Sequence, residues 1–478
     1  MIAYGRDYAD PLAEEDGGSS ANPGERHRGQ LRLAYALTGL FAERLMFVHG
    51  VGWLAWDGAR WAEDTRGEAK RAVAETLRAA LDRAVKMPAR DDRDALIADV
   101  RKCETANGVA GVLELAAALE PFAFTVTDLD SDPLLLNCRN GILDLRTFEL
   151  SPHDPLARCT KVTRAAYRPE ATSTLWLPFL DRVLPDPAVR DYLQRFAGLS
   201  LLGKVIEHIF TIATGTGANG KGTAYNALLY ALGDYGHAAE SDLFMQAKAN
   251  PNSASPALMG LRGKRLIVVS ETERDQKLAV ALMKNLTGGD PVTARPLYGK
   301  PVTFAPSHTS LMVTNYLPKV AGDDPAVWRR VRVIPFDVVI PPAERNGLLG
   351  EQLELDADAV LGWALAGLRQ YQANGLAEPD GVLAATDEYQ HSSDAVARFL
   401  AESCYLSPHA SAVTGELFER WCRWAIEDGA ESMSAKKFGM ALDAHGYATK
   451  GGTGRDARQR KGIGLLAEDR DDSDEAPR

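Results

Sequence analysis

The residues of this chain that most clearly suggest chemistry form a glycine-rich run containing a lysine. The run, from Gly215 to Thr223, reads GTGANGKGT; it follows an apolar segment and opens a helical pattern. Glycines let backbone amides turn toward an anion, and a helix amino terminus adds the positive end of a dipole. We therefore predict a phosphate-binding loop in which Lys221 reaches the outer phosphates of a nucleotide. The predicted contacts are Gly215, Gly217, Ala218, Asn219, Gly220, Lys221, Gly222 and Thr223.

The Mg²⁺ ion that accompanies a nucleotide needs oxygen ligands near this loop. A serine or threonine often follows the lysine, but here that residue is Gly222, so Thr223 is the predicted hydroxyl ligand. The apolar segment 266–270 ends at Glu271, and Glu273 follows. A carboxylate there could hold the ion and polarise water, with Glu271 as the first choice. The alternatives are a glycine-rich turn that binds nothing and, for Glu273, a solvated loop acid.

Two further positions fit a reaction at a terminal phosphate. Apolar residues 311–314 lead to Asn315, whose amide could orient an attacking water. Arg329 and Arg330 precede another apolar strand, and arginine can stabilise a transferring phosphoryl group, often from a neighbouring subunit. An arginine pair taken alone is usually a surface feature, and the choice between the two stays open. The predicted catalytic residues are Lys221, Glu271, Glu273, Asn315, Arg329 and Arg330.

The elements that would position these residues alternate between short apolar strands and helices. Strands are predicted at 209–213, 266–270, 311–314 and 331–339, with a long helix after Lys221. Such alternation predicts an α/β core with a largely parallel sheet. Mixed helical and strand-like segments precede this core, and the last third of the chain is mainly helical.

The composition is that of an ordinary globular protein. The chain has 478 residues, of which 45% are apolar and 25% charged, which excludes a collagen-like or wholly disordered chain. Its net charge of −11 excludes a basic footprint over the whole chain. Five dispersed cysteines argue against a disulfide framework, and no apolar run is long enough to span a membrane. A cytoplasmic protein is expected.

The loop and the residues after it resemble the superfamily 3 helicase domain of phage, plasmid and poxvirus primase-helicases. The matching residues are Gly215–Thr223, Ser270–Glu273, Lys284–Tyr298, Thr314, Asn315, Arg329, Arg330, Pro335 and Phe336. The TGGD and AR motifs within Lys284–Tyr298 are the most specific, and the resemblance extends from about Val48 to Gly464. It implies an AAA+-like P-loop ATPase that uses ATP and Mg²⁺ and forms a ring, usually a hexamer, around a nucleic-acid strand.

Composition and resemblance together predict five parts. These are a weakly ordered arm at 1–47, a helicase-associated domain of helical and mixed structure at 48–203, the ATPase domain at 204–385, a winged-helix domain at 386–466 and a disordered acidic tail at 467–478. The first 47 residues are too few for a primase domain with its own core. A separate primase or polymerase is therefore an expected partner.

Nucleic-acid contacts are predicted in two places. In this family a hairpin near residues 295–301 projects into the pore of the ring, where Arg295 and Lys300 could follow phosphates and Tyr298 could stack on a base. Toward the carboxyl terminus, a helix after Ser434 and a basic hairpin suggest a winged helix that contacts the DNA backbone. The basic candidates there are Lys436, Lys437, Lys450, Arg455, Arg458, Arg460 and Lys461. The alternatives are packing residues of the sheet and a solvated basic loop.

These features predict an ATP-dependent, ring-forming DNA helicase of a phage or mobile element, in the cytoplasm of a bacterial host. Its expected partners are a single DNA strand in the pore, a duplex or fork at the winged helix, and further copies of the chain, with no membrane. One alternative is an ATP-switched origin-binding or loading protein without processive unwinding. Another is a small-molecule phosphotransferase, because GKGT loops also occur in nucleotide kinases.

Overall fold

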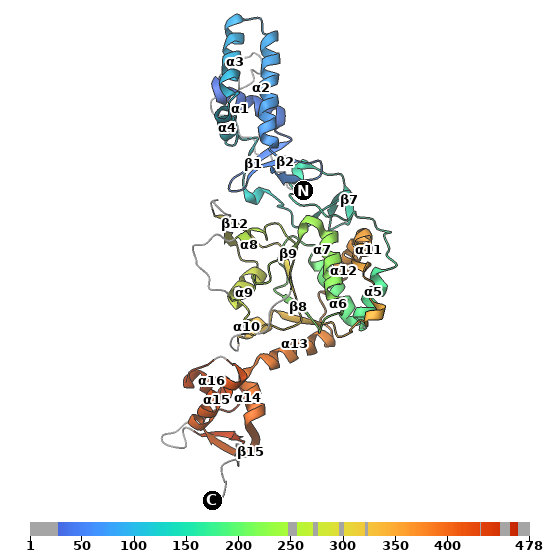
Figure 1. Ribbon diagram of the computed structural model, residues 1–478, viewed down its shortest axis with the longest axis vertical. Helices are drawn as coiled ribbons and strands as arrows, with labels where there is room; N and C mark the ends of the chain where they lie inside the picture. The colour runs from blue at the N-terminus through green and yellow to red at the C-terminus, as the bar shows by residue number, and fades with distance from the viewer. Residues whose placement is uncertain are drawn as a thin grey trace, which may run out of the picture. The chain divides into compact units, whose positions relative to one another are not determined.

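The computed structural model describes residues 27–246, 256–270, 276–295, 301–320, 324–430, 432–449 and 459–466. The chain divides into two compact units (Figure 1). The first comprises residues 1–57 and 61–128, and the second comprises residues 58–60 and 129–478. All the residues predicted to do chemistry belong to the second unit.

Four helices and a small sheet make up the first unit. The helices are α1 (Gly29–Phe41), α2 (Glu68–Lys86), α3 (Arg90–Cys103) and α4 (Ala106–Ala116). Strands β1 (Leu45–Val48), β2 (Gly52–Trp56), β3 (Trp61–Glu63) and β4 (Ala123–Phe124) form a sheet in the order β3-β2-β1-β4. The 3-10 turn η2 (Val126–Asp128) ends the unit.

Helix α1 shortens the arm that was predicted at 1–47. Leu33, Leu37 and Phe41 recur every four residues and are buried in one core with Val73. This apolar stripe gives α1 a face to pack against the other helices of the unit. The limit of the arm was therefore placed too late, since helical structure begins at Gly29.

The second unit begins with a three-stranded antiparallel sheet and two helices. These are β5 (Leu135–Cys138), β6 (Gly141–Asp144), β7 (Glu149–Ser151), η3 (Pro155–Ala157), α5 (Trp176–Val183) and α6 (Pro187–Leu199). Buried Leu136, Trp176 and Phe196 share one hydrophobic core with the large sheet that follows. The domain predicted at 48–203 is thus divided after residue 128. The residues after this point bury their apolar side chains in the core of the second unit.

A five-stranded parallel sheet forms the centre of the second unit. Its strands are β8 (Phe210–Thr214), β9 (Gly236–Ala239), β10 (Leu266–Ser270), β13 (Thr309–Thr314) and β14 (Val331–Pro335). They lie in the order β14-β8-β13-β10-β9, and each neighbouring pair is parallel. The predicted α/β core with a parallel sheet is confirmed. Because the strands are parallel, the residues that follow β8, β10 and β13 all lie at the carboxyl end of the sheet, where such sheets bind their ligands.

Helices surround this sheet and continue beyond β14 (Figure 1). They are α7 (Lys221–Leu232), η4 (Gly233–Tyr235), α8 (Pro256–Met259), α9 (Val280–Gly288), α10 (Pro325–Trp328), η5 (Pro342–Glu344), α11 (Leu349–Leu355), α12 (Ala357–Asn374) and α13 (Asp380–Ser393). A hairpin of β11 (Val292–Ala294) and β12 (Val302–Phe304) stands between α9 and β13. No helix in the described part of the chain combines the length and hydropathy needed to cross a bilayer.

Residues 394–466 form a carboxyl-terminal module within the second unit. Its elements are α14 (Ala395–Ser403), β15 (Cys404–Val413), α15 (Thr414–Asp428), α16 (Ala435–Ala444) and β16 (Gln459–Leu465). Strand β15 pairs antiparallel with β16, and Thr449 also pairs with Arg460 of β16. Phe399, Trp421 and Phe438 contact one another in its core. The predicted helix after Ser434 is present as α16, and the mainly helical character of this part was predicted, whereas β15 was not.

Candidate functional site

The backbone of the glycine-rich run joins β8 to α7 in a conformation that needs glycine. Gly220 precedes α7 with a φ of 80°, and a Cβ atom there would lie 2.6 Å from Cγ1 of Val183. A Cβ atom on Gly215 would lie 2.3 Å from the carbonyl oxygen of Phe336. Neither position admits a side chain without movement of its surroundings. The tight turn therefore aims the amino terminus of α7 at the space beside the loop, as anion-binding loops do.

Lys221 is buried inside this loop, with 5% of its surface exposed. Its Nζ donates to the carbonyl oxygen of Gly215 at 2.7 Å, to Oδ1 of Asn219 at 3.2 Å and to Oδ1 of Asn315 at 3.1 Å. Burial lowers the pKa of Lys221 from 10.5 to about 8. All three acceptors are neutral, so the ammonium group has no described carboxylate against it. Such a charge is suited to exchange its neutral partners for an anion.

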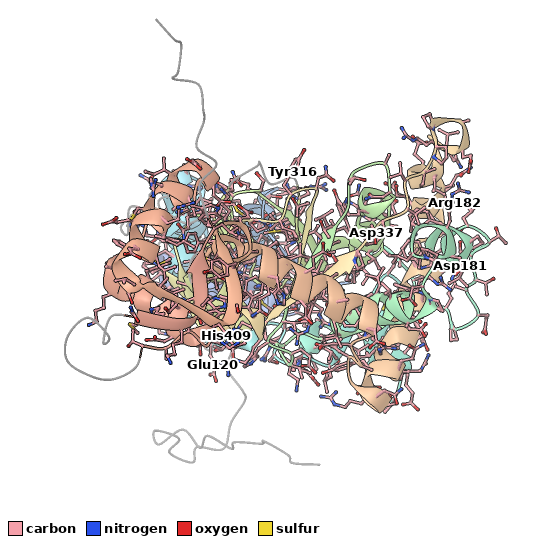
Figure 2. All side chains as sticks on the ribbon, turned by 90° about the horizontal axis from the view of Figure 1, so that it is seen from below. Glu120, Asp181, Arg182, Tyr316, Asp337 and His409 are labelled. Carbon is pink, nitrogen blue, oxygen red and sulfur yellow. The ribbon has the colours of Figure 1, made fainter. Side chains whose placement is uncertain are left out.

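Asn219 fastens the loop to the segment that follows β14. Its Nδ2 donates to the carbonyl oxygen of Phe336 at 2.9 Å, while its Oδ1 accepts from Lys221. One residue earlier, the carbonyl oxygen of Ala218 accepts from the amide of Ile340 at 2.8 Å. The segment 336–340, which includes Asp337 (Figure 2), thus closes one side of the loop. The sequence singled out Asn219 and Phe336 but offered no sign that they bond to each other.

Asn315 reaches Lys221 because their strands are neighbours. β13 pairs with β8 in a register that sets Thr314 beside Thr214, so the residues after both strands lie together. The structure thus brings Asn315 to the loop lysine, a contact that was not predicted from the sequence. β10 is the next strand along and ends at Ser270. Glu271 and Glu273 come directly after it and lie outside the described residues.

The hydroxyl predicted to hold Mg²⁺ lies away from Lys221. Successive helical residues turn by about 100°, so Thr223 is about 200° around α7 from Lys221. Thr223 lines a cavity of about 540 Å³ with Asn226 and Tyr230 on the same face of α7. Gly222 carries no oxygen, although a Cβ atom there would meet nothing closer than Tyr225 Cε1 at 3.9 Å. The described residues contain no cluster of three metal-binding side chains. Thr223 therefore does not fit the ion well, and the loop fits phosphate better than it fits metal.

Arg329 and Arg330 lie at the amino-terminal end of the parallel strands, whereas Lys221 lies at their carboxyl-terminal end. The carbonyl oxygen of Arg330 accepts from the amide of Phe210 at the start of β8, whereas Lys221 comes after the end of β8. A five-residue strand separates these two ends of the sheet by roughly 15 Å. Arg330 donates to the carbonyl oxygen of Ala326 at 3.1 Å, and Arg329 is exposed. The two arginines and Lys221 are thus not brought together within one chain.

The predicted nucleic-acid contacts differ in exposure. Arg295 is exposed at the end of β11. Lys436 and Lys437 are exposed at the start of α16, and Lys461 is exposed on β16. Tyr298, Lys300, Lys450, Arg455 and Arg458 lie outside the described residues.

Arg460 is buried in the module rather than exposed to a ligand. Its guanidinium donates to Asp443 at 2.6 Å, to the carbonyl oxygen of Gly439 at 2.8 Å and to Oγ1 of Thr414 at 3.2 Å. These bonds join β16 to α15 and α16. Arg460 thus holds the module together and has no exposed guanidinium to offer to DNA.

Two family models match separate parts of the chain, and the first of them spans the boundary between the two units. A family described as D5 N terminal like matches residues 34–185, and a family of unknown function (DUF5906) matches residues 213–330. "Putative helicase L207/L206" of Acanthamoeba polyphaga mimivirus is 28% identical over 61% of this chain and 33% of its own length. "Putative primase C962R" of African swine fever virus (strain Badajoz 1971 Vero-adapted) is 26% identical over 46% of this chain and 24% of its own length. Together these matches support a D5-like primase-helicase of viruses and phages as the family of this chain.

The D5-like chain spans about a third or less of the length of the curated relatives it matches. "Putative helicase 022R" of Frog virus 3, for example, is 26% identical over 59% of this chain and 30% of its own length. The match to residues 213–330 contains Lys221, Asn315 and both arginines. A solved structure of the NrS-1 C terminal region overlaps 76% of this chain and 75% of that chain, with 13% identity and a TM-score of 0.46.

Proposed function

We propose that this D5-like chain is an ATP-dependent DNA helicase that acts in viral or phage replication. The observation that carries the proposal is the 3.1 Å contact between Lys221 and Asn315 at the carboxyl edge of the parallel sheet. A buried ammonium with neutral partners is suited to receive the phosphates of ATP. Relatives that are named as helicases support DNA as the polymer on which the motor acts.

Each residue of the site then has a distinct role. The loop amides hold the phosphates, and Lys221 turns from its neutral partners to the β- and γ-phosphate oxygens. Asn315 orients the water that attacks the terminal phosphate. Glu271, the first residue after β10, would polarise this water and would hold the Mg²⁺ ion. When bound, Mg²⁺ would neutralise the charge that develops on the phosphates.

The position of the arginines supports a ring in which each site is completed by a second copy. Neither arginine can reach the loop of its own chain across the length of the sheet. We assign the trans-acting role to Arg329, because it is exposed while Arg330 bonds to Ala326. The family resemblance favours six copies.

Two surfaces are proposed to contact DNA. The β11–β12 hairpin, with Arg295 at its end, would follow a single strand in the pore. The module has the order helix, strand, two helices and a paired strand, which supports a winged helix. Lys436, Lys437 and Lys461 would contact phosphates of a duplex or fork, so binding should weaken with salt.

Replacement of Lys221 by alanine tests the proposal. ATP hydrolysis should fall at least about a hundredfold, because the charge that faces the transferring phosphate is lost. Strand displacement from forked DNA should fall with it. Lys204→Ala removes an exposed lysine from the same unit and should leave both activities unchanged. Circular dichroism of both variants would show that the fold is retained.

The outcomes separate the candidate functions. DNA-stimulated hydrolysis that survives in Lys221→Ala would contradict the site. Hydrolysis by the unaltered chain without strand displacement would favour an origin-binding or loading protein. Transfer of labelled phosphate to a nucleoside monophosphate would favour a phosphotransferase. A bacterial host stays a prediction, since the curated relatives come from viruses of eukaryotes.

A further inference from the structure

Helix α13 carries two buried hydroxyl groups that bond to other segments of the second unit. Oγ1 of Thr386 accepts from the amide of Val333 at 3.0 Å, in the middle of β14. Tyr389 follows almost one helical turn later and is also buried. The helix then leads into α14 of the carboxyl-terminal module (Figure 1). Thr386 bonds α13 to a strand of the sheet, whereas Tyr389 bonds it to a segment outside the strands.

The hydroxyl of Tyr389 donates to the carbonyl oxygen of Pro318. Pro318 is buried three residues after Asn315, on the segment that begins with half-exposed Tyr316 (Figure 2). The next residue, Lys319, exchanges backbone hydrogen bonds with residues 276–278, at 2.8 Å and 2.9 Å. Tyr389 is therefore bonded to the segment that follows Asn315, the residue proposed to orient the attacking water.

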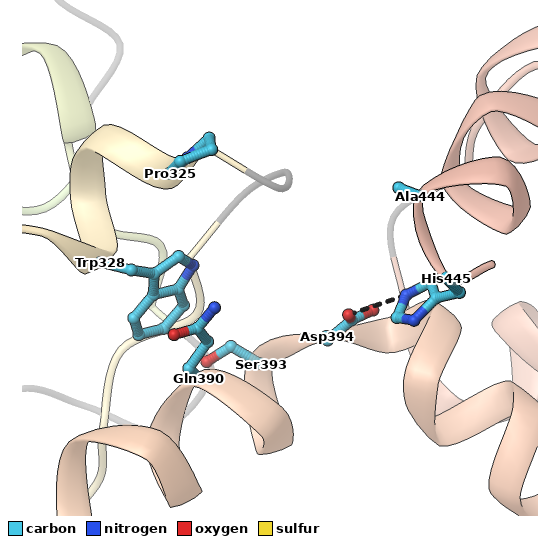
Figure 3. A pocket seen from close by; sticks show the side chains of 7 residues that line it. All are labelled: Pro325, Trp328, Gln390, Ser393, Asp394, Ala444 and His445. Atoms are coloured by element: carbon cyan, nitrogen blue, oxygen red, sulfur yellow. Dashed lines mark ion pairs between the residues drawn. The ribbon is translucent and has the colours of Figure 1, made fainter. Parts of the chain in front are cut away.

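The ring of Tyr389 contacts a second segment, the one that carries the arginines. It packs edge-on against Trp328, with ring centroids 5.2 Å apart and planes at 81°. Trp328 ends α10 and directly precedes Arg329. Trp328 also lines a cavity of about 220 Å³ with Gln390 and Ser393, so it has room to shift (Figure 3). One side chain thus contacts both the Asn315 segment and the Arg329 segment.

We propose that Tyr389 is a positioning residue that links the nucleotide bound in one subunit to the arginine offered to the next. This inference rests on the proposed function. When Asn315 moves on loss of the γ-phosphate, the buried hydrogen bond carries Pro318 and Tyr389 together, because breaking it would leave a buried carbonyl without a donor. The tyrosine ring then moves Trp328 and with it Arg329. For this link, the contact between Tyr389 and Trp328 must take a second packing, because coupling between sites needs an element with two arrangements.

Tyr389→Phe tests this link, and Thr386→Val is its matched control. Each removes one buried hydroxyl that bonds α13 to the backbone of another segment, so both should lower the melting temperature by a similar amount. Tyr389→Phe should in addition lower the kcat of ATP hydrolysis about fivefold or more and reduce its Hill coefficient toward one. Thr386→Val should keep the kcat and the Hill coefficient of the unaltered protein. Binding of a fluorescent ATP analogue should be alike in all three.

A second variant changes Trp328, the ring that Tyr389 contacts on the arginine segment. Trp328→Leu leaves the hydrogen bond to Pro318 in place but removes the ring contact, so it should reproduce the loss of cooperativity. Equal kinetics in Tyr389→Phe and Thr386→Val would overturn the inference, as would an unaltered protein that hydrolyses ATP without cooperativity. Both results leave the Lys221 site standing. Absence of hydrolysis in the unaltered protein would instead overturn the proposed function and this link with it.

Discussion

Two buried cations of the second unit, Lys221 and Arg460, differ in the charge of their hydrogen-bond partners. Both belong to basic motifs that the sequence marks for binding. Lys221 bonds to three neutral oxygens, whereas Arg460 pairs with the carboxylate of Asp443 and donates to two backbone carbonyls. A buried charge without a counter-charge is costly to the fold, and an arriving anion relieves the cost. A buried charge that is already paired has nothing to gain from a ligand.

The comparison indicates how a binding cation can be told from a structural one. Burial does not distinguish them, because Lys221 and Arg460 are 5% and 3% exposed. The identity of the acceptors does. We therefore expect ligand binding to depend on Lys221 and folding of the module to depend on Arg460.

The largest effect on stability should come from Arg460. Arg460→Met removes the charge that holds Asp443 and leaves the carbonyls of Gly439 and Tyr447 without their donor, so the module should lose about 3 kcal/mol of unfolding free energy. Lys461→Ala changes the exposed neighbour and should leave stability within about 0.5 kcal/mol. Chemical denaturation measures both.

DNA binding, in contrast to stability, should depend on Lys461 and not on Arg460. Lys461→Ala should reduce the slope of log affinity against log salt by about one, as expected for one lost phosphate contact. A stable, folded Arg460→Met protein with weakened DNA affinity would contradict the structural role of Arg460. An unchanged salt slope in Lys461→Ala would remove Lys461 from the proposed DNA surface.

The parallel sheet and the loop could be predicted because their signals are local. Alternating apolar segments and the spacing of glycines around Lys221 depend on neighbours in sequence. The position of Asn315 at a strand end could be predicted in the same way. Its contact with Lys221 could not, because the sheet order that makes their strands neighbours required the structure.

Other features could not be predicted because they depend on distant residues. Asn219 bonds to Phe336, which lies 117 positions along the chain. The charge pattern around Arg460 is equally compatible with a solvated hairpin and with a buried ion pair. Thr223 was chosen as a ligand because it is the nearest hydroxyl, but helical rotation turns it to another face of α7.

The pH dependence of the unfolding free energy tests whether the buried charge of Lys221 lacks a counter-charge. Burial lowers the pKa of Lys221 to about 8, while a free lysine titrates near 10.5. Between these values the unfolded chain binds more protons than the folded chain, so stability should rise with pH. Relative to Lys221→Met, the gain should be on the order of 1–2 kcal/mol from pH 8 to pH 9.5.

The sign of this trend is diagnostic. Below about pH 8 both states are charged, and the difference from Lys221→Met should be flat. A saturating ATP analogue should abolish the rise, because phosphate favours the charged form of the lysine. Denaturation curves at four pH values, with and without the analogue, measure this. A difference that falls with pH would mean that a carboxylate faces Lys221.

The smallest effect concerns the oxygen that is missing beside Lys221. Gly222→Ser would supply a hydroxyl next to the loop lysine, and the space around Gly222 accepts a Cβ atom. The Mg²⁺ concentration needed for half-maximal binding of a fluorescent ATP analogue should fall by about three- to tenfold, equivalent to roughly 1 kcal/mol. Gly222→Ala is the control, since it adds the same Cβ atom without an oxygen. Equal Mg²⁺ dependence in the two variants would mean that the ion binds away from α7, and the electrostatic relief of Lys221 would then come from phosphate alone.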